Sequence, residues 1–114
     1  NELLLLTDAD CIPDSTDWLK EMVTPMHGRS QVVLGFAPFE KSPGFLNAWI
    51  RYEGVYTAWL YFSAALWGQP YMGVGRNLAY RKEMYVSAGG FEENQDLPGG
   101  DDDLLVNSFF EKTD

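Results

Sequence analysis

Short unbroken apolar runs alternate along the chain with longer segments of helical period. Residues 3–6 are four consecutive leucines followed by the acidic tetrapeptide 7–10, and the mainly apolar segments 31–36 and 77–81 are the next strand candidates. Short runs without alternation, closed by polar residues, are typical of strands buried on both faces of a parallel sheet. We therefore expect a strand at each of these three positions.

Periodic segments lie between and after these runs, and they predict helices over residues 17–26, 43–67, 82–88 and 101–112. Pro43 stands where proline favours the start of a helix. The aspartates at the start of the last segment suit the positive end of a helix dipole. Because strands alternate with helices, the order of elements predicts an α/β fold with a mostly parallel sheet flanked by helices.

The longest periodic segment carries a stripe of aromatic and other side chains spaced three and four residues apart, which places them on one helix face. This aromatic stripe comprises Phe45, Trp49, Tyr52, Tyr56, Trp59, Ser63 and Leu66. The interpretation that we favour is that the stripe belongs to the core. A sugar-stacking platform and an amphipathic helix resting in a membrane interface are the alternatives, since Trp and Tyr concentrate at such interfaces.

Composition narrows the class of protein. The 114 residues are 46% hydrophobic with a net charge of −9, which fits one globular domain and excludes a disordered chain. The acidity argues against a protein that binds nucleic acid electrostatically. The single Cys11 excludes an internal disulfide framework and a cysteine-rich zinc site, and it fits a reducing compartment. No apolar run is long enough to predict a membrane-spanning helix.

The first chemical motif is the acidic pair Asp8 and Asp10, directly after the leucine run. Ligands of parallel α/β sheets bind at the carboxyl ends of strands. Two carboxylates spaced by one residue at such an end can share a hard cation, completed by phosphate oxygens and water. An acidic turn that only ends the strand is the alternative.

The second motif is the triple aspartate Asp101, Asp102 and Asp103. Adjacent carboxylates repel one another, so we expect at least one raised pKa if the cluster is partly buried. A carboxylate with a raised pKa suits a general base. A solvated helix N-terminus explains the same residues without function.

The third motif is the glycine-rich segment 70–81, in which glycines permit close approach of a ligand to the backbone. Residues 54–82 contain no Asp or Glu, yet they include Arg76, Arg81 and Lys82. A cationic strip beside acidic metal ligands suits a phosphorylated substrate. A loop with ordinary surface arginines is the alternative.

In this order and spacing, the motifs together resemble the family 2 glycosyltransferases, the inverting group that includes cellulose, chitin and hyaluronan synthases. The resemblance covers nearly the whole chain. It rests on residues 3–10, on the segment 75–82 with the Gly-Gly-Phe turn at 89–91, and on Gly100-Asp101-Asp102. The aromatic segment and residues 70–77 resemble a bacterial, membrane-associated branch.

The resemblance implies a GT-A fold, related to the Rossmann fold, together with a divalent cation (Mg or Mn) and a nucleotide-sugar donor. It implies a saccharide or lipid-linked acceptor and a location at the cytoplasmic face of the membrane. By the family pattern Asp10 and Asp8 hold the metal and Asp8 also contacts the donor, Asp102 is the base with Asp101 beside it, and Asp103 is a weaker candidate. Arg76, Asn77 and Arg81 are candidates for donor binding, and Trp67, Tyr71, Gly73 and Gly75 for contact with the acceptor or sugar.

The start of the chain inside an apolar strand suggests a fragment. We expect residues 1–114 to be the C-terminal half of a catalytic domain, lacking the nucleotide-binding half and inactive alone. The strand at 3–6 would then have an exposed apolar edge that favours self-association. Two other functions remain open: another metal-dependent α/β phosphotransferase or hydrolase, and a non-catalytic binding module.

Overall fold

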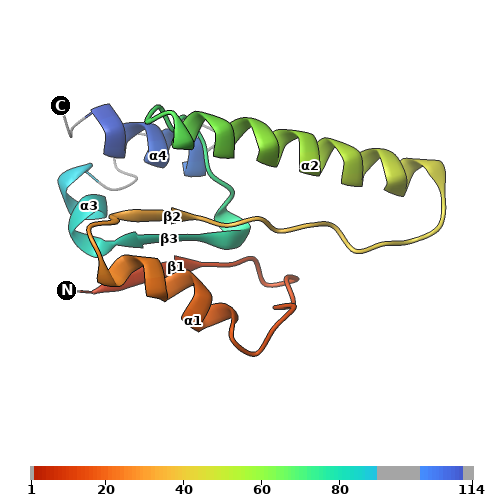
Figure 1. Ribbon diagram of the computed structural model, residues 1–114, viewed down its shortest axis with the longest axis horizontal. Coiled ribbons are helices and arrows are strands. Elements are labelled where there is room, and N and C mark those ends of the chain that lie inside the picture. The colour runs from red at the N-terminus through yellow and green to blue at the C-terminus, as the bar shows by residue number, and fades with distance from the viewer. Residues whose placement is uncertain (1, 90–100, 112–114) are drawn as a thin grey trace.

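The computed structural model describes residues 2–89 and 101–111. Its elements, shown in Figure 1, are β1 (Leu3–Leu6), α1 (Trp18–Val23), the 3₁₀ helix η1 (Thr24–His27), β2 (Val32–Leu34), α2 (Phe45–Leu66), the 3₁₀ turn η2 (Gly75–Asn77), β3 (Leu78–Arg81), α3 (Lys82–Ser87) and α4 (Asp101–Glu111). All three predicted strands and all four predicted helices are present. Two residues of the Gly-Gly-Phe turn, 90 and 91, and the segment between that turn and Asp101 lie outside the described residues.

The first helix is shorter than predicted. It ends at Val23, and the chain continues as η1 because Pro25 has no N–H group to extend an α-helical ladder. Tight 3₁₀ turns are common where an α-helix ends in this way.

The prediction of a GT-A, Rossmann-like fold with a mostly parallel sheet flanked by helices is wrong. The described strands form one antiparallel sheet in the order β1-β3-β2, with Leu6 and Leu34 both opposite Leu78. The central strand β3 therefore runs against both neighbours. The four leucines of β1 are each only partly buried, as suits an edge strand rather than the fully buried strand inferred from the unbroken run. Hydrophobic period indicates where strands and helices lie along the chain, but it carries no information on strand direction.

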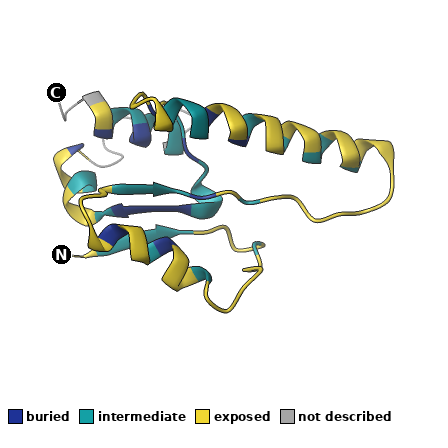
Figure 2. Ribbon diagram, in the orientation of Figure 1, coloured by how far each residue is buried: buried dark blue, intermediate teal, exposed yellow. Residues whose placement is uncertain are grey.

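The main core lies between one face of the sheet and the helices α3 and α4 (Figures 1 and 2). Side chains alternate across a strand, so Leu78 and Tyr80 of β3 share this face. Both are buried, and they pack with Leu105, Val106 and Phe109 of α4. This packing fixes the start of α4 beside the start of β3.

The opposite face of the sheet is covered by α1 and η1, from which Met22 and Met26 are buried. Arg81, at the end of β3, ties this layer to the sheet. Its guanidinium donates to the main-chain oxygen of Met26 at 2.6 Å, and its Nε donates to the oxygen of Ser30 at 3.3 Å.

The longest helix, α2, confirms the predicted segment but not the favoured interpretation of its stripe. The stripe is exposed, with Phe45, Tyr52 and Trp59 at 82%, 60% and 66%, and Figure 2 shows an exposed surface along most of α2. Of the 22 residues of α2, only Ala58 and Tyr61 are buried. The prediction that the stripe belongs to the core is therefore wrong, because the face that packs against the chain is the opposite one.

Candidate functional site

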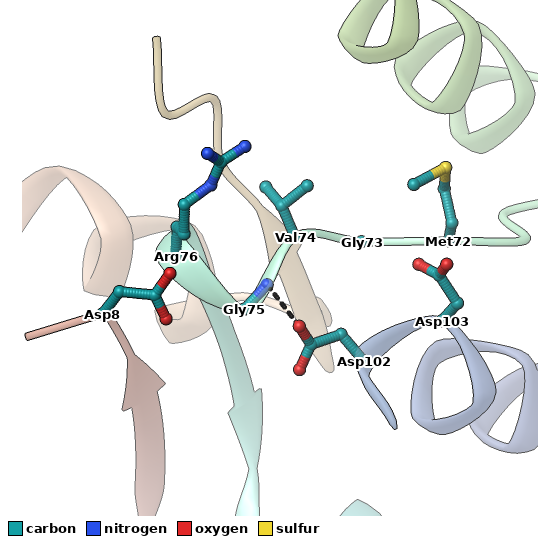
Figure 3. A pocket seen from close by; sticks show the side chains of 8 residues that line it. All are labelled: Asp8, Met72, Gly73, Val74, Gly75, Arg76, Asp102 and Asp103. Carbon is teal, nitrogen blue, oxygen red and sulfur yellow. Dashed lines mark hydrogen bonds between the residues drawn. The ribbon is translucent and has the colours of Figure 1, made fainter. Parts of the chain in front are cut away.

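A cavity of about 360 Å³ opens where the end of β1, the turn η2 and the start of α4 meet, and Figure 3 shows it from close by. It is lined by Asp8, Met72, Gly73, Val74, Gly75, Arg76, Asp102 and Asp103. One member comes from the first acidic motif, five from the glycine-rich segment and two from the triple aspartate. The three motifs, which span nearly the whole chain, therefore converge on one cavity.

The antiparallel register explains this convergence. Leu6 is opposite Leu78, so the residues after β1 lie beside the residues before β3. Asp8 is two residues beyond Leu6, and Arg76 is two residues before Leu78. The acidic strand end and the start of the cationic strip are thus brought together by strand pairing alone.

Asp102 is attached to the turn by a main-chain hydrogen bond. The amide of Gly75 donates to Asp102 Oδ2 at 2.8 Å, drawn as the dashed line in Figure 3. A Cβ added at position 75 would lie 2.7 Å from Asp102 Cγ and Oδ1, well inside van der Waals contact. Glycine is required at position 75 because the Asp102 carboxylate occupies the space that a side chain would fill. Backbone conformation is not the reason, because the φ angle of Gly75 is not positive.

Asp103 lies beside Asp102 at the cavity wall, and its pKa is raised above the ordinary value of 3.8. Burial is the main cause, because it penalises the charged carboxylate, and the neighbouring charge of Asp102 adds to it. A hydrogen bond from the main chain of Gly73 acts in the opposite direction. The expectation of a raised pKa in this cluster is confirmed at Asp103. The backbone of Asp101 begins α4, and its side chain is outside the described part of the structure.

Asp8 also belongs to a second group, with Asp10 and Cys11. One ligand atom from each of these three residues lies within 4.8 Å of the others, and both carboxylates are exposed. Carboxylate oxygens suit a hard cation such as Mg²⁺ or Mn²⁺, whereas a thiol does not. Asp8 and Asp10 are therefore the two members of this group that would hold a divalent cation.

Arg76 lines the cavity and also reaches beyond it. Its guanidinium lies over the ring of Phe39, 4.5 Å from the centroid, a geometry that favours a cation against an aromatic face. Phe39 was not a sequence candidate. No local signal identifies it, because the contact joins the loop after β2 to a turn far along the chain.

Two predicted donor-binding residues have structural contacts away from the cavity wall. Asn77 Oδ1 accepts from Trp18 Nε1 at 3.0 Å, and Asn77 Nδ2 donates to the main-chain oxygen of Phe36 at 3.0 Å. Arg81 lies opposite Leu3, at the far end of β3 from Asp8, and holds η1. The structure does not place either side chain in the cavity lining.

The residues predicted to contact the acceptor also fall into two groups, one in the cavity lining and one outside it. Gly73 and Gly75 line the cavity. Trp67 caps the C-terminus of α2 and is 89% exposed, while Tyr71 is exposed and outside the lining.

Comparison with known proteins gives no relative: no family model, no curated protein and no solved structure matches the chain. Within residues 2–89 and 101–111, no helix combines the length and apolar character needed to cross a membrane.

Proposed function

We propose that this chain carries the metal and base ends of a glycosyltransferase site. Its full-length protein would transfer a sugar from a nucleotide-diphosphate donor to an acceptor hydroxyl with inversion, in the synthesis of cell-surface polysaccharide or glycolipid. The observation that carries the proposal is that Asp8, Arg76 and Asp102 line the same cavity. The resemblance of the motifs to family 2 glycosyltransferases supplies the reaction.

The chemistry required by an inverting transfer matches the residues around the cavity. A divalent cation held by Asp8 and Asp10 would neutralise charge on a departing diphosphate. Arg76 adds a fixed positive charge at the same wall. Asp102 is the group that accepts the proton of the attacking hydroxyl. Its Oδ2 is oriented by the Gly75 amide, and no hydrogen bond to its Oδ1 is found among the described residues.

Asp103 is the weaker candidate for the base in this proposal. Its pKa is raised, mainly by burial, and a raised pKa suits a general base. Asp102 is preferred because the Gly75 amide orients its Oδ2 at the cavity wall, and because the family pattern assigns the base to this position.

The test uses the full-length protein with UDP-glucose or UDP-N-acetylglucosamine, Mn²⁺ or Mg²⁺, and short oligosaccharide acceptors. Asp102→Asn keeps an oxygen that accepts from Gly75 but removes the base. We expect kcat to fall about 10²- to 10⁴-fold while the affinity for the donor is retained. Asp14→Asn, at an exposed position outside the cavity lining, is the matched control and leaves kcat unchanged.

The alternative functions give different results. A phosphotransferase or hydrolase releases phosphate or nucleotide without forming a glycosidic bond, and a binding module does neither. Unchanged turnover in Asp102→Asn, or a product that retains the anomeric configuration of the donor, would contradict the proposal.

A further inference from the structure

A second cavity of about 270 Å³ lies between the loop after β2 and the helix α2. Its lining includes Phe36 and Phe39 from the loop, Glu53 and Tyr61 from α2, and Val74 and Arg76 from the segment before β3. Val74 and Arg76 also line the first cavity. The two cavities are therefore neighbours that share a wall.

One side of the second cavity is aromatic. The ring of Phe39 is covered in part by the Arg76 guanidinium, and the side chain of Tyr61 is buried. The Tyr61 hydroxyl donates to the main-chain oxygen of Gly35 at 2.9 Å, so this tyrosine holds α2 against the end of β2. The aromatic surface open to a ligand is therefore that of Phe36 and Phe39, which are 38% and 42% exposed, and such a surface suits a ligand with a flat apolar face.

The cavity also presents two opposite charges. Glu53 can only accept hydrogen bonds when ionised, and Arg76 can only donate them. Among the described residues the one recorded ion pair joins Lys82 to Glu2, so Glu53 and Arg76 are not paired with each other. Their hydrogen-bonding capacity is directed to a ligand or to solvent.

A pyranose ring has the complementary chemistry. It combines an apolar C–H face with a rim of hydroxyls that both donate and accept hydrogen bonds. A sugar hydroxyl can donate to Glu53 and accept from Arg76, whereas an ionised phosphate offers acceptors only and a hydrocarbon chain offers neither. The volume is near the lower end of small-molecule pockets, about 300 Å³, which suits one sugar ring rather than a whole nucleotide.

We propose that the second cavity is a saccharide subsite that holds the ring of the acceptor next to the base Asp102, with Glu53 and Phe39 as its contacts. The inference rests on the proposed function. Val74 and Arg76 line both cavities, and this shared wall brings an acceptor next to a donor only if the first cavity is the transfer site. It adds two residues, Glu53 and Phe39, that no sequence motif indicates.

The first experiment needs no turnover. Saturation-transfer NMR on the full-length protein uses methyl β-glucopyranoside and methyl β-N-acetylglucosaminide as probes, with uridine as competitor. We expect at least one glycoside to bind, and Glu53→Gln to weaken it about tenfold through loss of a charged hydrogen-bond acceptor. Glu40→Gln, an exposed glutamate outside both cavities, is the matched control and binds as the wild type does. Phe39→Leu supplies an independent loss through the aromatic wall.

The second experiment separates the two proposals. Binding of UDP with Mn²⁺, measured by calorimetry, tests the donor site, and it is expected to be the same in wild type, Glu53→Gln and Glu40→Gln. Absence of UDP binding and of transfer in the wild type overturns the proposed function. Absence of glycoside binding in the wild type, or equal binding by Glu53→Gln and Glu40→Gln, overturns the saccharide subsite while UDP binding stands. If uridine displaces the glycoside at a concentration lower than that of the glycoside itself, the cavity is assigned to a nucleobase. This result also overturns the saccharide subsite.

Discussion

The contact between Gly75 and Asp102 leads to a quantitative prediction about stability. In Gly75→Ala the new Cβ would lie 2.7 Å from Asp102 Cγ, so the carboxylate must move away from the turn. The movement breaks the hydrogen bond from the Gly75 amide. A hydrogen bond to a charged group contributes about 1.5–3 kcal/mol.

A second effect has the opposite sign. Alanine restricts the unfolded chain more than glycine does, which stabilises a protein by about 0.4–1 kcal/mol where the native backbone accepts it. The φ angle of Gly75 is not positive, so this gain applies. We therefore expect Gly75→Ala to lower the free energy of unfolding by about 0.5–2.6 kcal/mol, as the difference of these two contributions.

The assay is a double-mutant cycle measured by urea unfolding. In an Asp102→Ala background the obstacle is absent, so Gly75→Ala should become stabilising by about 0.4–1 kcal/mol. Gly54→Ala is the control, because its Cβ would meet only Phe39 at an ordinary 3.6 Å, and its effect should be the same in both backgrounds. Equal effects of Gly75→Ala in the two backgrounds would refute the reasoning.

The remaining predictions concern charge, a hydrogen-bonded junction and the aromatic stripe. The folded pKa of Asp103 is raised above 3.8, so the folded protein binds this proton more tightly than the unfolded chain, and stability is lost as the pH rises from below 3.8 through the folded pKa. Asp103→Asn has no carboxyl group to titrate at this position, so it should not show this loss. Its free energy of unfolding relative to wild type should therefore rise across that pH window, as measured by urea titrations between pH 3 and 7. A difference between the two proteins that stays constant with pH contradicts the burial of Asp103. Asn77→Ala removes two hydrogen bonds, to Trp18 and to Phe36, and should cost about 1–3 kcal/mol with a change in tryptophan fluorescence; an unchanged midpoint of unfolding contradicts its role as a junction. If the exposed stripe of α2 rests in a membrane interface, Trp49→Ser with Trp59→Ser should abolish co-sedimentation with phosphatidylcholine–phosphatidylglycerol vesicles, while Leu19→Ser, at an exposed position on α1, should not; equal sedimentation of both variants argues against the interface.

Local pattern is sufficient to predict most of the elements and insufficient to predict their arrangement. Helical period and the Ser42-Pro43 start place α2 within two residues of its observed bounds. The same period cannot tell which face is covered, because that depends on the loop after β2 packing against Tyr61 and its neighbours. Both faces of α2 carry large apolar side chains, so helical period alone favours the core for a stripe that the structure leaves exposed.

The candidate site was predictable in its residues more than in its geometry. Asp8, Arg76 and Asp102 belong to motifs that chemistry alone singles out, and all three line one cavity. What brings them together is the antiparallel pairing of β1 with β3, which the parallel-sheet prediction missed. The roles of Asn77 and Arg81 depend on carbonyl groups far away in the sequence, and no local sequence pattern predicts hydrogen bonds to such groups.

The cavity joins residues from near both ends of the described chain, and this gives it a thermodynamic consequence. A ligand that contacts Asp8 and Asp102 together has no binding site in the unfolded chain, where the two residues are far apart. Such a ligand binds only the folded state, and it stabilises that state by about 2.7 kcal/mol at a concentration one hundred times its Kd. Melting temperature is therefore a general reporter for this cavity: it responds to any occupant, whether or not that occupant reacts.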